Sequence, residues 1–193
     1  MAILSGLFLS LLSVSWAQQF QGDVVSGTLP SQDGSEVAYF KIDDPSGAND
    51  HLTLVNYQSL GSDGQRLNNQ NVERAVIMMA GLFRDAGDYM NHTLSALYKV
   101  PAGAGPSRDN VAIITPVFPN EQDEGVAWTQ GSNVLVWHEN DWAYGRNNIY
   151  PSSSTNTSSF SVLDQLVAYY NDQNTFPNVK EIVVAGHSMG SQV

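Results

Sequence analysis

A serine between two glycines directly follows a short apolar run near the end of this sequence. The run covers residues 182–185 and is rich in β-branched side chains, and the motif G-H-S-M-G covers residues 186–190. This order predicts a sharp turn from a strand into a helix, which holds Ser188 in a strained conformation with its hydroxyl exposed. Glycines flank such a turn because the nearby backbone leaves no room for a β-carbon. The pattern favours a nucleophilic serine over the alternative, a plain Gly/Ser loop after a buried strand.

Strand-like and helix-like segments alternate along the chain. Alternating and continuous apolar runs predict five strands, at residues 37–42, 51–57, 75–80, 111–115 and 182–185. The first two flank a turn-rich segment and predict an opening hairpin. The other three are apolar throughout, which is typical of strands buried on both faces of a parallel sheet.

Two segments carry the helical period. The first follows Asp88, a candidate N-cap, and ends at Pro101, and its apolar face comprises Met90, Leu94, Leu97 and Tyr98. The second begins near Ser159 or Ser161 and ends before Pro177, and its face comprises Phe160, Leu163, Leu166, Val167 and Tyr170. Strands that alternate with helices predict an α/β fold with a doubly wound, mostly parallel sheet. Its active site should lie at the carboxyl ends of the strands.

Four segments carry a recognisable pattern: residues 183–192 around the serine, residues 80–89, which begin A-G-L-F-R-D, and residues 115–119 and 158–164. In these segments the chain resembles the α/β-hydrolase superfamily, and more narrowly its secreted fungal members. The resemblance implies the α/β-hydrolase fold and acyl transfer through Ser188.

Acyl transfer needs backbone N–H groups aimed at the oxyanion of the tetrahedral intermediate. The resemblance implies that the amide of Met189 is one donor and an amide after Gly81, that of Leu82, is the other. Many relatives have a histidine where this chain has Ala80, so Phe83 stays open as an alternative donor. We expect no cofactor and no metal ion.

The resemblance also implies a base and an orienting acid, in the chain order Ser, Asp or Glu, His. No Asp, Glu or His follows Ser188, and the four histidines precede it: His51, His92, His138 and His187. Consecutive side chains on a tight turn point apart, so we expect His187 to pack or hydrogen-bond beside the strand rather than act as the base. We therefore expect an α/β-hydrolase domain that is incomplete at its C-terminus, and a 193-residue chain that is inactive and poorly soluble by itself.

Residues 1–17 have the pattern of a secretory signal peptide, because a short apolar run precedes the small-residue site S-W-A. A membrane anchor is the alternative, but the run is shorter than the ~20 apolar residues that span a bilayer. Residues 18–193 then form the N-terminal part of one secreted domain, and no later stretch predicts a membrane span. Two sequons, at Asn91 and Asn156, are consistent with export and glycosylation.

The chain is strongly acidic, with 19 acidic and 8 basic residues and a net charge of −11. Such a surface repels phosphate backbones and anionic lipids, so we expect no binding to nucleic acid. The sequence has no cysteine, so its stability must come from packing rather than disulfides.

Three further groups have two interpretations each. An aromatic group could line an acyl pocket or fill the core: Trp128, Trp137, Trp142, Tyr144 and Tyr150. An acidic group could bind Ca²⁺, but it lacks ligand spacing and a solvated face is favoured: Glu121, Asp123, Glu124, Glu139 and Asp141. Arg84 and Asp85 could form a local ion pair or remain solvated charges.

Taken together, the sequence predicts a secreted serine hydrolase that acts on carboxylic esters, either small molecules or polymers. An acyltransferase or peptidase that uses the same serine is an alternative. A non-catalytic adhesion or binding module on the same scaffold is another.

Overall fold

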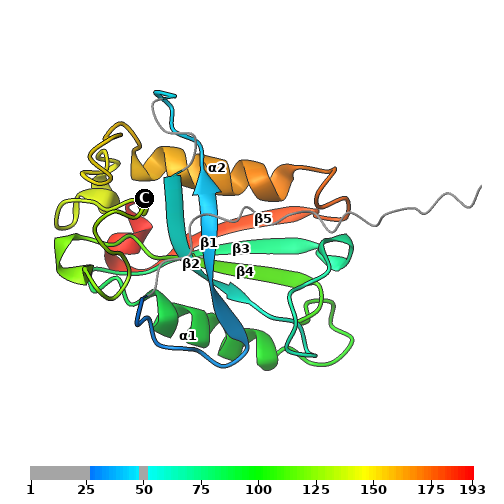
Figure 1. Ribbon diagram of the computed structural model, residues 1–193. Coiled ribbons are helices and arrows are strands. Elements are labelled where there is room, and N and C mark those ends of the chain that lie inside the picture. The colour runs from blue at the N-terminus through cyan, green and yellow to red at the C-terminus, as the bar shows by residue number, and fades with distance from the viewer. Residues whose placement is uncertain (1–26, 48–51) are drawn as a thin grey trace, which may run out of the picture.

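Five strands form one mixed sheet in the order β1-β2-β4-β3-β5 (Figure 1). The computed structural model of the chain describes residues 27–47 and 52–193, so the predicted signal peptide at residues 1–17 and His51 lie outside the described residues. The strands are β1 (Ser35–Ile42), β2 (Leu52–Ser59), β3 (Arg74–Met79), β4 (Val111–Pro116) and β5 (Glu181–Gly186). β3 pairs in parallel with β4 and β5, whereas β2 runs antiparallel to both of its neighbours. The predicted parallel character therefore belongs to three strands of a mixed sheet.

The predicted opening hairpin is confirmed. β1 pairs antiparallel with β2 from Ser35 opposite Ser59 to Ile42 opposite Leu52. β2 is buried along its whole length, because it lies between β1 and β4 with a core on each face.

Two helices cover opposite faces of the sheet (Figure 1), as a doubly wound arrangement requires. They are α1 (Ala86–Tyr98) and α2 (Ser159–Asn171). Met90 and Leu94 of α1 belong to a buried cluster with Val55 and Ile113. The other face has its own cluster, in which Val162, Leu166 and Tyr170 of α2 pack with Leu54 and Ile77 of the sheet.

The helix boundaries correct one sequence prediction, the cap of α1, and confirm another, the start of α2 at Ser159. α1 begins at Ala86 and its N-cap is Asp85, because the amides of Asp88 and Tyr89 both donate to the Asp85 carbonyl. Asp88 therefore lies in the first turn instead of capping the helix. α2 begins after Ser158, whose side chain accepts a hydrogen bond from the Ser161 amide.

Phe160 was predicted on the buried face of α2, and this is wrong. The fully buried positions are Ser159, Val162, Leu166 and Tyr170, which follow one another at helical spacing. Phe160 is one residue, or about 100° of helix rotation, away from Ser159 and is 42% exposed.

The aromatic group mostly belongs to the core. Trp128, Trp137 and Trp142 are all buried. Phe118 stacks on Trp142 at 5.3 Å between ring centroids and meets the edge of Trp137 at 5.1 Å. Tyr144 is the exposed member of the group, at 59%. The indole rings thus stabilise the long segment between β4 and α2.

β5 is the outer strand of the described sheet, which corrects its predicted burial on both faces. It pairs with β3 on one side, and Val184 is 44% exposed. Among the described residues, no strand covers its other edge. In the same ranges, no helix combines the length and the apolar character needed to cross a membrane.

The chain leaves β3 and β5 toward opposite faces of the sheet. After β3, Ala80 and Ala86 join the cluster on the α1 face. After β5, Met189 and Val193 pack against the cluster on the α2 face. In α/β proteins, ligands bind where the chain leaves two neighbouring parallel strands toward opposite faces of the sheet.

Candidate active site

Ser188 lies at the turn that immediately follows β5. It begins the short 3-10 helix η4 (Ser188–Ser191), its φ is 56°, and it is exposed. A non-glycine residue in this left-handed region costs on the order of 1–2 kcal/mol. Two hydrogen bonds hold the turn, from the Gly190 amide to the His187 carbonyl at 3.0 Å and from Ser191 Oγ to the Ser188 carbonyl at 2.6 Å.

The two glycines of the motif are required by close backbone contacts. A β-carbon on Gly186 would overlap the Gly190 carbonyl and lie 2.9 Å from the Ser191 nitrogen. A β-carbon on Gly190 would overlap the Ala80 carbonyl and lie 2.7 Å from the Met79 oxygen. Gly190 therefore packs the serine turn directly on the end of β3.

The Gly81 turn lies beside Ser188. Gly81 follows β3, and its carbonyl accepts the amide of Arg84 at 3.0 Å. A β-carbon on Gly81 would lie 3.6 Å from Cβ of Ser188 and 3.5 Å from the His187 carbonyl. The structure thus brings together two turns that are about 100 residues apart in sequence, because parallel strands end at the same edge of the sheet.

Three backbone amides of the Gly81 and Ser188 turns make no hydrogen bond to another described residue. Within residues 27–47 and 52–193, the N–H groups of Leu82, Phe83 and Met189 donate to no protein acceptor. The Leu82 and Phe83 side chains are 41% and 83% exposed. Free N–H groups on both turns are the donor type that stabilises an oxyanion.

Arg84 fixes the far side of the Gly81 turn, and its partner differs from the predicted one. Its φ is 55°. Its guanidinium contacts the carboxylate of Asp123 at 3.1 and 3.3 Å, with the two side chains only 15% and 26% exposed. Asp123 Oδ2 also accepts the Asn120 amide at 2.9 Å. The partner is therefore not Asp85 but a residue 39 positions later, which no local pattern could have identified.

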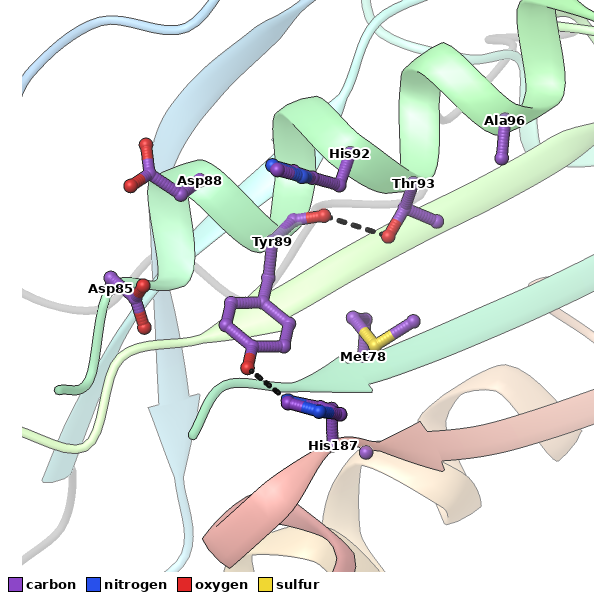
Figure 2. A pocket seen from close by; sticks show the side chains of 9 residues that line it. Met78, Asp85, Asp88, Tyr89, His92, Thr93, Ala96 and His187 are labelled. Carbon is purple, nitrogen blue, oxygen red and sulfur yellow. Dashed lines mark hydrogen bonds between the residues drawn. The ribbon is translucent and has the colours of Figure 1, made fainter. Parts of the chain in front are cut away.

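A cavity of about 620 Å³ opens between α1 and the ends of β3 and β5 (Figure 2). Met78, Thr93 and Ala96 are among its lining residues, together with Tyr89 and His187. The Tyr89 hydroxyl lies 3.0 Å from Nδ1 of His187. Sequence analysis missed Tyr89, because nothing in a helical pattern distinguishes it from an ordinary core tyrosine.

The described residues supply no base to Ser188. Within the described ranges, no side chain makes a hydrogen bond to its hydroxyl, and Nδ1 of His187 meets Tyr89 instead. His138 pairs with Glu121, and His92 lines the cavity. Among the described residues, the structure therefore places the serine turn beside the Gly81 turn with no histidine hydrogen-bonded to the Ser188 hydroxyl.

Two members of the acidic group form ion pairs, Glu121 with His138 and Asp123 with Arg84. Glu121 contacts the His138 ring and accepts the Glu139 amide at 3.0 Å. Its hydrogen bond and charge raise the pKa of His138. In the part of the chain that the structure describes, no group of three or more His, Cys, Asp or Glu residues could hold a metal ion.

No protein-family model matches the sequence, and no curated protein matches it. Among solved structures, the chain is similar to the siderophore hydrolase EstB from Aspergillus nidulans, with 16% sequence identity and a TM-score of 0.39. The match covers 84% of this chain and 52% of that protein, so the chain spans about half the length of EstB. A similarity of this size leaves the activity to be argued from the chemistry of the site.

Proposed function

We propose that the protein is a serine hydrolase that cleaves carboxylic esters. Ser188 Oγ attacks the acyl carbon, and the amides of Met189 and Leu82 bind the oxyanion. The alcohol then leaves, and water releases the acid from the acyl-enzyme. The observation that carries the proposal is the contact between the strained, exposed Ser188 and the Gly81 turn. A serine with free amides on two adjoining turns is the arrangement that acyl transfer needs.

The proposal also needs a general base, which by resemblance follows the serine in the chain. The experiment is therefore done on the longest polypeptide that the reading frame encodes. A fluorophosphonate should label the peptide that contains Ser188, and ester turnover should stop in Ser188→Ala. Ser152→Ala removes a hydroxyl from an exposed turn away from the site and should keep the label. Unchanged ester turnover in Ser188→Ala would overturn the proposal.

Export is part of this proposal. Asn91 and Asn156, the two sequon residues, are both exposed, which leaves them open to a glycan. Expression in a fungal host should give a protein in the medium that begins at residue 18 and loses mass on deglycosylation. An intracellular product that retains residue 1 would contradict the proposed export but not the proposed hydrolase activity.

A further inference from the structure

Tyr89 reaches from α1 to the serine turn (Figure 2). Its hydroxyl lies 3.0 Å from Nδ1 of His187, the residue directly before Ser188, and the two rings are 6.4 Å apart between centroids. The base of the side chain is fixed, because Tyr89 lies within the first turns of α1 and its neighbour Met90 is fully buried. Thr93 Oγ1 also donates to the Tyr89 carbonyl at 2.7 Å.

The same hydroxyl adjoins the other turn of the site. A β-carbon on Gly81 would lie 3.0 Å from the Tyr89 oxygen, so the phenol fills the space beside Gly81. The His187 carbonyl, 3.5 Å from that same position, accepts the Gly190 amide and closes the serine turn. Tyr89 therefore contacts the Gly81 turn and the Ser188 turn at once, from a third element of the fold.

We propose that Tyr89 is a positioning residue for Ser188. The hydrogen bond between its hydroxyl and Nδ1 of His187 fixes the orientation of the imidazole ring. With one turn held on each side of the phenol, the Ser188 oxygen stays between the amides of Met189 and Leu82. This role in catalysis depends on the proposed function, whereas the clamp on the turn can be measured without it.

The test compares Tyr89→Phe with Tyr98→Phe, which removes the same hydroxyl from a half-exposed ring on the same helix. The first measurement is hydrogen exchange of the Gly190 amide. Loss of one hydrogen bond should speed this exchange roughly fivefold in Tyr89→Phe. It should change less than twofold in Tyr98→Phe. In ¹⁵N spectra, the Nδ1 resonance of His187 should move in Tyr89→Phe alone.

The second measurement is phosphonate labelling of Ser188. In Tyr89→Phe the maximal labelling rate should fall roughly fivefold. The half-saturating reagent concentration should stay unchanged, because the phenol acts on the turn and not on the reagent. A variant that only destabilised the fold would not lower the maximal labelling rate while leaving the half-saturating reagent concentration unchanged.

Unchanged Gly190 exchange and labelling in Tyr89→Phe would overturn the inference. If wild-type Ser188 takes no label, the proposed hydrolase fails, and Gly190 exchange still decides the role of Tyr89. If Tyr89→Phe does not fold, His187→Leu breaks the same bond from the other side. It should then accelerate Gly190 exchange to a similar extent, and normal exchange in that variant would reject the clamp.

Discussion

Gly190 packs against Ala80 so closely that a β-carbon on Gly190 would overlap the Ala80 carbonyl oxygen. This contact joins the serine turn to the end of β3. The two residues are far apart in the sequence, yet the geometry of Ser188 depends on their approach.

Gly190→Ala should therefore lower the free energy of unfolding by about 3 kcal/mol, because the backbone cannot move out of the way. Gly103→Ala is the matched control. Gly103 has a φ of 82° and nothing within 4 Å of a β-carbon, so it should lose only about 1 kcal/mol to backbone strain. Urea unfolding measures both variants. An equal decrease in the free energy of unfolding in the two variants would show that the close contact at Gly190 does not add to the destabilisation.

The Arg84–Asp123 pair should stabilise the Gly81 turn measurably. A double-mutant cycle with Arg84→Gln and Asp123→Asn should give a coupling free energy of about 1 kcal/mol, since the pair is bidentate and mostly buried. The Lys180–Glu73 pair is 71% and 51% exposed and should give about 0.3 kcal/mol in the same cycle. A coupling for Arg84 no larger than that of the control would show that the turn holds its shape without this pair.

Trp142 should be among the most costly residues to truncate. Its ring is 1% exposed and stacks on Phe118, so Trp142→Ala should lower the free energy of unfolding by about 4 kcal/mol. Tyr144→Ala removes a neighbouring exposed ring and should change it by less than about 0.5 kcal/mol. Thermal and urea unfolding both measure the difference. Similar values for the two variants would place Trp142 outside the core.

The Glu121–His138 pair should give a pH-dependent signal. The hydrogen bond and charge of Glu121 raise the pKa of His138 above its ordinary 6.5. Burial by itself would raise the pKa of Glu121, but hydrogen bonds from His138 and the Glu139 amide outweigh it and lower that pKa below 4.5. The stabilisation from His138 is therefore complete below pH 6.5 and is lost as pH rises through its higher folded pKa. The contribution of Glu121 is lost as pH falls through its lowered pKa.

An NMR titration of the His138 ring checks this. Glu121→Gln should move the midpoint down toward the ordinary value, because it removes the charge that favours the imidazolium. Glu124→Gln removes a nearby charge that has no part in the pair and should leave the midpoint in place. A midpoint that does not respond to Glu121→Gln would contradict the pairing.

Phe83 should contribute to the binding of apolar esters. Its side chain is 83% exposed and comes two residues after Gly81, so it can cover an acyl chain at the site. Phe83→Ser should raise KM for a p-nitrophenyl octanoate roughly fivefold with little change in kcat, since only uniform binding is lost. The acetate ester should be unaffected. Phe160→Ser, an exposed phenylalanine on α2, serves as the control and should change neither substrate.

Sequence patterns located most of the fold because strand and helix periods are local. The predicted strand at 111–115 and β4 differ by a single residue at one end, and the opening hairpin follows from two strands around a short turn segment. The start of α1 was predicted less well. Asp85 and Asp88 are both suitable caps by residue type. Which one caps α1 depends on where the chain leaves the Gly81 turn and enters the helix.

The sequence by itself determined that an apolar strand at 182–185 runs into a serine turn flanked by Gly186 and Gly190, because this pattern is local. What tertiary structure decided is which groups surround that serine. Asp123 reaches Arg84 across 39 residues, and His187 meets Tyr89 across 98. Such contacts form only after the strands have paired in parallel and α1 has packed on the sheet. A hydrogen bond depends on distances in space, and sequence separation carries no information about them until the topology is fixed.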